Sequence, residues 1–170
     1  MKRIISLSLL ILLLTGLLTG CFIDATPAFD QQFLGEYKPF TKAGMTITLP
    51  DNFTEQESIY GFDAYYVANF AGVCVLKEEF TLEPGLADRP LEQYIKDVIA
   101  NNGREIEPKF VDGLWFYEAY SGSSFIRSYC YKGTDAFYIV QFICQPDDRN
   151  TLADLFHTWA LSVKLEDQTV

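Results

Sequence analysis

The chain has 170 residues, and its 13 basic and 23 acidic side chains give a formal net charge of −10. That length suits one domain, or one domain with a tail. The charge argues against a nucleic-acid-binding protein, because no excess of Lys and Arg exists to displace counterions from phosphates. Eleven glycines and seven prolines are too few for a fibrous or low-complexity chain.

Residues 1–20 have the features of a secretory signal peptide. Lys2 and Arg3 provide a positive start, and an apolar run of 15 residues follows from Ile4 to Leu18. A signal peptide needs an apolar run of about 7–15 residues, whereas a membrane-spanning helix needs roughly 20. We therefore expect this segment to be cleaved from the mature protein.

The end of this segment matches the bacterial lipoprotein box. Leu18-Thr19-Gly20-Cys21 combines a branched apolar residue, two small residues and a cysteine. The small residues suit the narrow site of a signal peptidase, and a cysteine thiolate is the nucleophile that accepts a diacylglycerol group. An ordinary secretory signal that happens to end in cysteine is the alternative. The sequence predicts Cys21 as the lipid-attachment site.

Lipidation would decide where the protein is held. Without Lys2 and Arg3 the mature chain has 11 basic and 23 acidic residues, so anionic lipid headgroups would repel it. One acyl chain binds membranes marginally, whereas two or three hold firmly. We expect a protein anchored by acyl chains on Cys21 to the outer side of a bacterial cell membrane, with residues 21–35 as a tether and 36–170 as one domain.

Several strands are predicted from alternating or continuous apolar runs bounded by turn residues. Turn residues at Lys42-Ala43-Gly44 and at Gly133-Thr134 indicate hairpins. The predicted strands cover residues 45–49, 64–70, 73–80, 114–120, 125–131 and 136–145.

Two amphipathic helices are predicted from apolar residues at helical spacing. Pro90 suits the first turn of one helix and Gly103 its end, and Asp148 or Asn150 suits the start of the other. The apolar positions are Leu91, Tyr94, Ile95, Val98 and Ile99 in the first helix, and Leu152, Leu155, Phe156, Trp159 and Val163 in the second.

The run 136–145 is largely apolar on both faces, so we expect both faces of this strand to be covered. One helix is available for each face. Because hairpins join the strands, the sequence predicts an α+β fold in which helices cover both faces of an antiparallel sheet, an α/β/α sandwich.

Three segments resemble the PsbP-like family. Gly44-Met45-Thr46-Ile47-Thr48-Leu49-Pro50, followed by Phe53, is similar to its opening strand. The aromatic hairpin 125–145 and the closing run 159–165 are similar to its end, so the resemblance covers about residues 40–166. The family includes plant photosystem accessory proteins, a Ran-binding eukaryotic relative and bacterial exported proteins. The resemblance implies a non-enzymatic domain that binds a partner or stabilises an assembly, and it brings no catalytic motif or metal ligands.

No motif of a hydrolase, a phosphate-binding loop or a zinc protease occurs in the sequence. His157, the single histidine, falls on the flank or the polar side of the second helix, and we expect a solvated surface side chain. Asp147, Asp148 and Asp154 do not have the spacing of a calcium loop, and they suit the helix N-terminus instead. The sequence therefore predicts no catalytic residue, cofactor or metal site.

Three cysteines remain if Cys21 carries lipid. A two-residue turn at Gly133-Thr134 would place Cys130 opposite Phe137 and on the other face from Cys144, so these two should not bond directly. A disulfide from Cys74 to either stays possible, and buried free thiols are the simpler expectation.

Tyrosines crowd the predicted strands. We expect most in the core and some facing outward, where a tyrosine can anchor a partner. The tyrosines are Tyr65, Tyr66, Tyr117, Tyr120, Tyr129, Tyr131 and Tyr138.

These observations favour a lipid-anchored envelope protein that binds or supports another envelope protein and is not an enzyme. A small-ligand or metal-cation binding module on the cell surface is the alternative. A hydrolase whose acidic residues meet only in three dimensions is a third possibility.

Overall fold

The computed structural model describes residues 35–57 and 61–166. The predicted signal peptide, Cys21 and the tether up to residue 34 lie outside the described residues. Among the described residues, no helix has the length and apolar character needed to cross a membrane.

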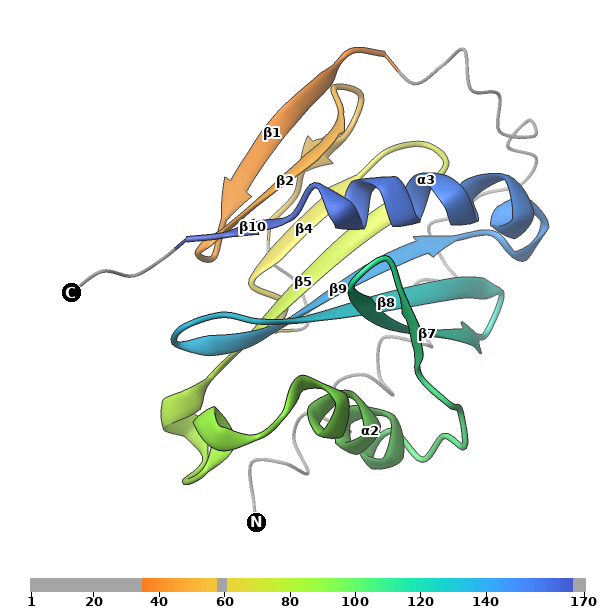
Figure 1. Cartoon of the computed structure of the whole chain (residues 1–170). Coiled ribbons are helices and arrows are strands. Elements are labelled where there is room, and N and C mark those ends of the chain that lie inside the picture. The colour runs from red at the N-terminus through yellow and green to blue at the C-terminus, as the bar shows by residue number, and fades with distance from the viewer. Residues whose placement is uncertain (1–34, 58–60, 167–170) are drawn as a thin grey trace.

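A seven-stranded sheet forms the centre of the fold (Figure 1). All its neighbouring strands pair antiparallel. The middle strand is the one with two apolar faces, and all nine of its residues are buried, as predicted. In spatial order the strands are β3 (Thr54–Glu55), β4 (Ala64–Val67), β5 (Gly72–Glu79), β9 (Ala136–Cys144), β8 (Ser124–Lys132), β7 (Leu114–Ser121) and β6 (Lys109–Val111).

A second, three-stranded sheet has the order β1 (Tyr37–Lys42), β2 (Met45–Pro50) and β10 (Lys164–Leu165). The predicted hairpin turn joins β1 to β2, where Ala43 and Gly44 have φ of 58° and 81°. Positive φ at both central residues is the mark of a tight hairpin turn. On β2, Met45, Ile47 and Leu49 are buried and alternate with half-buried threonines, which confirms the predicted period of two.

Both predicted helices are present, as α2 (Leu91–Asn101) and α3 (Arg149–Leu161). Gly103 lies just after α2 with φ of 65°, and its amide donates to the carbonyl of Ala100, as expected of a C-terminal glycine. The described residues also form three short 3₁₀ helices, η3 (Phe80–Leu82), η4 (Leu86–Asp88) and η5 (Pro146–Asp148).

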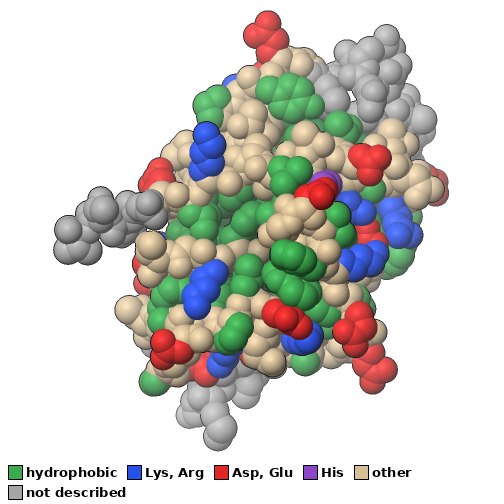
Figure 2. All heavy atoms as spheres, in the orientation of Figure 1, with side chains coloured by type: hydrophobic (Ala, Val, Ile, Leu, Met, Phe, Trp, Pro, Cys, Tyr) green, Lys and Arg blue, Asp and Glu red, His purple; other side chains and the backbone are tan. Residues whose placement is uncertain are grey.

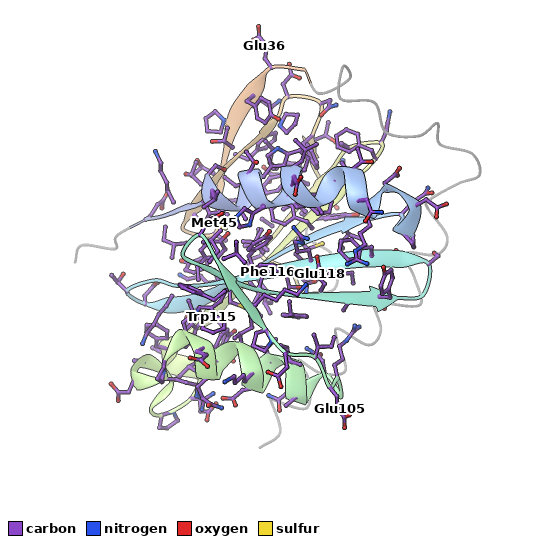
Figure 3. The ribbon with its side chains drawn as sticks, turned by 45° about the vertical axis from the view of Figure 1, so that its right-hand side comes forward. Glu36, Met45, Glu105, Trp115, Phe116 and Glu118 are labelled. Atoms are coloured by element: carbon purple, nitrogen blue, oxygen red, sulfur yellow. The ribbon has the colours of Figure 1, made fainter. Side chains whose placement is uncertain are left out.

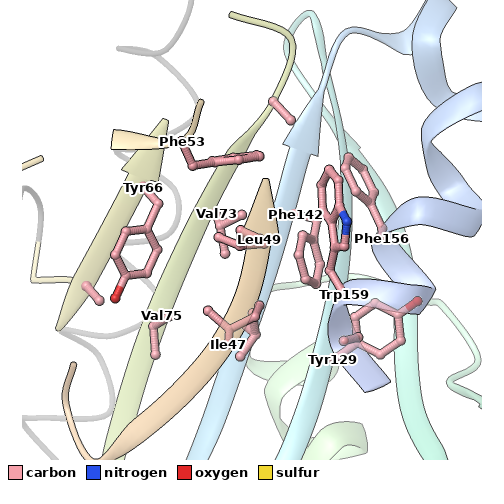
Figure 4. Packing of buried hydrophobic residues seen from close by; sticks show 14 of the residues in the cluster. Ile47, Leu49, Phe53, Tyr66, Val73, Val75, Tyr129, Phe142, Phe156 and Trp159 are labelled. Carbon is pink, nitrogen blue, oxygen red and sulfur yellow. The ribbon is translucent and has the colours of Figure 1, made fainter. Parts of the chain in front are cut away.

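Two hydrophobic clusters form on the large sheet. The buried side chains of α3 pack with those of β2 and with Phe142 of β9 in the first cluster, which Figure 4 shows around Trp159. The buried side chains of α2 pack with Phe137 and Ile139 of β9 in the second. These clusters confirm a mixed α+β fold with antiparallel sheets. The small sheet that shares the side of α3 was not predicted.

The β8–β9 hairpin differs from its prediction. Lys132 pairs with Phe137, so residues 133–135 form the connection in place of a two-residue turn, and Ala136 at the start of β9 pairs only with Glu79 of β5. Cys130 consequently lies opposite Ile139 rather than Phe137. Because this shift moves the pairing by two residues, Cys130 stays on the same face.

All three described cysteines are free and buried. Cys74 and Cys130 lie in the cluster under α2, whereas Cys144 lies in the cluster under α3, so the expected separation of Cys130 from Cys144 is confirmed. Burial raises the pKa of all three thiols, to about 12 for Cys144.

Candidate functional site

Four charged side chains meet where β6, β7 and β8 approach the start of α3. They are Lys109, Glu118, Arg127 and Arg149, and we refer to them as the Glu118 cluster. Glu118 of β7 lies directly opposite Arg127 of β8. Lys109 comes from the edge strand β6, and Arg149 is the first residue of α3. Figure 3 labels Glu118 beside Phe116 on β7, and Figure 2 shows the gathering of basic side chains on the right of this face.

One carboxylate binds three cations in the Glu118 cluster. Oε1 of Glu118 accepts hydrogen bonds from Nε of Arg127 at 2.9 Å and from Nη2 of the same guanidinium. Oε2 accepts from Nζ of Lys109 at 3.0 Å and from Nη2 of Arg149 at 3.3 Å. The cluster therefore carries two positive charges in excess, on a chain whose net charge is −10.

The four side chains differ in their contact with solvent. Glu118 and Arg127 are each 12% exposed, whereas Lys109 is 55% and Arg149 is 39% exposed. Nη1 of Arg127 also donates to the carbonyl of Ala153 in α3 at 2.6 Å. The inner pair thus joins the sheet to α3, and the outer two cations face solvent.

The electrostatics of Glu118 reflect opposing effects. Partial burial raises the pKa of its carboxyl group, but hydrogen bonds from Arg127 and Lys109 outweigh burial and leave the pKa below its ordinary value. Glu118 is therefore ionised at neutral pH.

Aromatic rings support the cations. Lys109 and Arg127 both lie over the ring of Phe116, at 5.7 and 5.1 Å from its centroid. Arg149 lies over Phe125 at 5.1 Å and donates from Nη1 to the hydroxyl of Tyr120 at 2.9 Å. Cations over ring faces are attracted by the ring quadrupole, so these contacts fix where the charges point.

His157 lies next to the Glu118 cluster, at the centre of a chain of hydrogen bonds. Its Nδ1 shares a hydrogen bond with the hydroxyl of Tyr129 at 3.1 Å, and its Nε2 is 3.0 Å from Oδ2 of Asp112. The expected position on the flank of α3 is confirmed. The expectation of a solvated side chain was wrong, because the β6–β7 hairpin folds against α3 and partly covers the ring.

The order carboxylate, imidazole, hydroxyl is also that of a nucleophilic triad. Here the hydroxyl belongs to a fully buried tyrosine, and burial raises the pKa of Tyr129 to about 12. A buried phenol of that pKa is a poor nucleophile and is out of reach of a substrate. The hydrogen bonds of His157 therefore hold Asp112, at the tip of the β6–β7 hairpin, against α3.

No group of three or more His, Cys, Asp or Glu side chains within residues 35–57 and 61–166 is arranged to hold a metal ion. Asp147 and Asp148 lie in η5, before α3, and Asp154 is exposed on α3. Asp147 and Asp148 thus lie just before the helix start, as predicted, whereas the same prediction was wrong for Asp154, which lies beyond the first turn of α3.

Exposed apolar residues flank the Glu118 cluster. Val111 of β6 is 44% exposed and Tyr120 of β7 is 54% exposed. Of the seven tyrosines expected on strands from the sequence, Tyr120 is the exposed one, and the others are buried or half-buried. Of these seven, one thus faces outward as expected of a binding surface, and it contacts Arg149 of the cluster.

The Glu118 cluster was not predicted from the sequence. Its residues are spread over 41 positions of the chain. They become neighbours only through the β6–β7 and β7–β8 pairings and through the contact of α3 with the sheet. One local signal was available. Asp112-Gly113, with φ of 50° and 83°, is a strong two-residue hairpin signal that would have placed β6 beside β7.

Comparison with solved structures identifies the architecture. The solution structure of the cyanobacterial PsbP protein CyanoP from Synechocystis sp. PCC 6803 matches with a TM-score of 0.50 and 13% identity, over 82% of this chain and 98% of that one. The fold is PsbP-like. A crystal structure from Bacteroides thetaiotaomicron VPI-5482 matches this PsbP-like fold with a TM-score of 0.54 and 8% identity, over 81% of this chain and 51% of that one. No family model and no curated protein matches the sequence.

Proposed function

We propose that the chain is a non-enzymatic, lipid-anchored protein of the bacterial cell envelope whose PsbP-like domain binds or supports another envelope protein. Acyl chains on Cys21 would hold it at the outer side of the membrane. Residues 21–35 would act as the tether, and the large sheet of the domain would have one helix on each face.

The Glu118 cluster carries this proposal. It presents two exposed cations beside an exposed tyrosine and an exposed valine, on a chain that is otherwise strongly acidic. Arginine and tyrosine are enriched in protein–protein interfaces, and complementary charge directs a partner to one patch.

Replacing Cys21 with serine should release the protein from membranes. The Cys21→Ser variant has no thiolate to acylate, and the acidic domain is repelled by anionic headgroups. Fractionation of cells should place the wild type in the membrane pellet and most of the variant in the soluble fraction. Thr19→Ser keeps a small residue in the lipoprotein box and is the matched control. A Cys21→Ser protein that stays in the pellet would contradict the proposed anchor.

Crosslinking in living cells tests the partner. The tagged, lipidated chain should capture one dominant envelope protein that an unrelated lipidated domain does not capture. Val111→Ser with Tyr120→Ser should reduce that capture, because both side chains contribute apolar contact next to the cations. Equal capture by the unrelated domain would contradict the proposed function.

A further inference from the structure

We infer that the Glu118 cluster docks an acidic segment of a partner protein, whose carboxylates pair with Lys109 and Arg149. This inference rests on the proposed function and adds to it the chemistry of the partner.

The charge of the Glu118 cluster is incompletely balanced. Arg127 donates two hydrogen bonds to Oε1 of Glu118. The other oxygen, Oε2, accepts one hydrogen bond from Lys109 and one from Arg149. An ammonium group has three N–H donors and a guanidinium has five. Each outer cation therefore has donors free for a second carboxylate.

The two outer cations are held close together. Nζ of Lys109 and Nη2 of Arg149 both lie within hydrogen-bond distance of the same oxygen, so they are at most about 6 Å apart. Tyr120 and Phe125 further restrict Arg149. Because the cations are already positioned, binding loses less side-chain entropy than it would with two free surface chains. One carboxylate, or two on neighbouring residues, can bridge them.

The neighbouring side chains favour a peptide over a free anion. Val111 lies two residues from Lys109 on the same strand, so both point to the same face. Tyr120 likewise lies two residues from Glu118 on β7, so these two side chains also share a face. A ligand that places acidic groups on the cations would therefore also meet exposed apolar surface, which an acidic segment with interleaved apolar residues can cover.

The charges around the patch disfavour a membrane surface as its ligand. Asp112 is exposed beside Val111, and Asp154 is exposed on α3. An anionic bilayer is broad and flat, so it would meet these carboxylates together with the cations, within a Debye length of about 8 Å. A narrow peptide segment can contact the cations alone.

A defined peptide tests this docking. The probe is a fluorescent peptide with alternating glutamate and valine, and its control has glutamine in place of glutamate. Binding to the full chain in non-ionic detergent is measured by anisotropy. Lys109→Glu with Arg149→Glu should weaken binding about tenfold or more. Lys96→Glu with Lys164→Glu makes the same change in net charge at exposed positions away from the patch, and it should change binding about twofold or less.

Three results would overturn the inference: no binding of the glutamate peptide, equal binding of the glutamine peptide, or equal weakening by both pairs of substitutions. If the peptide fails and vesicles of phosphatidylglycerol bind through the two cations, the patch recognises lipid headgroups instead. Circular dichroism checks that each variant is folded. If Lys109→Glu with Arg149→Glu unfolds, the neutral variant Lys109→Gln with Arg149→Gln is used in its place. A partner captured in cells without peptide binding would leave the proposed function standing and remove only this inference.

Discussion

Trp159→Ala should lower the free energy of unfolding by about 3–5 kcal/mol, the usual cost of emptying a large buried aromatic site. Trp159 is almost fully buried and lies edge-on to Phe53 at 5.5 Å between ring centroids. It also contacts Phe142 of β9 and Phe156 of α3. The indole therefore joins α3, the large sheet and the turn after β2, and its removal leaves a cavity that none of them can fill alone.

Urea unfolding of the purified protein measures this loss. Leu161→Ala, on the same helix but with an exposed side chain, is the matched control and should cost less than about 1 kcal/mol. Equal losses in the two variants would mean that α3 does not pack as described.

Glu118→Leu should lower the free energy of unfolding by about 2–3 kcal/mol. The variant leaves Arg127, which is nearly covered, without the carboxylate that takes two of its hydrogen bonds. Removing one partner of a buried ion pair costs about 3–5 kcal/mol, and the partial exposure of this pair reduces that figure. Glu92→Leu breaks the exposed pair with Lys96 and should cost less than about 1 kcal/mol.

The pH dependence of the stability lost in Glu118→Leu identifies the cause of that loss. Because the pKa of Glu118 is lowered in the folded protein, its charged form stabilises the fold fully above the pKa of an unfolded glutamate, about 4.3. That stabilisation disappears as pH falls through the lower pKa of the folded state. The difference between wild type and Glu118→Leu should therefore be constant near pH 7 and shrink in acid. A difference that persists in acid would indicate lost packing in place of lost charge.

Long elements with a clear period were predictable from sequence, and short ones were not. The apolar spacing in α2 and the two apolar faces of β9 gave both elements nearly to their ends. β3 and β10 have two residues each, so no period exists to detect. Their pairing is decided by tertiary contacts, such as the amide of Glu166 donating to the carbonyl of Gly44 at the end of β10.

The candidate site was less predictable than the fold, because its chemistry depends on cross-strand neighbours. Glu118 has no charged residue next to it in sequence, and its partner Arg127 becomes its neighbour through the β7–β8 register. For His157, too, the contacts that surround the side chain could not be predicted from its position in the sequence. The helical period placed it on the correct flank of α3, but its cover comes from Asp112 on a hairpin 45 residues earlier.

The three buried thiols divide between the two sides of the large sheet, so they can report on each side separately. A thiol that is buried and has a raised pKa reacts with a labelling reagent only when the protein opens around it. The labelling rate of Cys74 and Cys130 would measure how often the cluster under α2 opens, and that of Cys144 would measure how often the cluster under α3 opens. Equal labelling rates at all three cysteines would mean that both sides of the sheet open in one cooperative event. Faster labelling on one side would show that this side opens first.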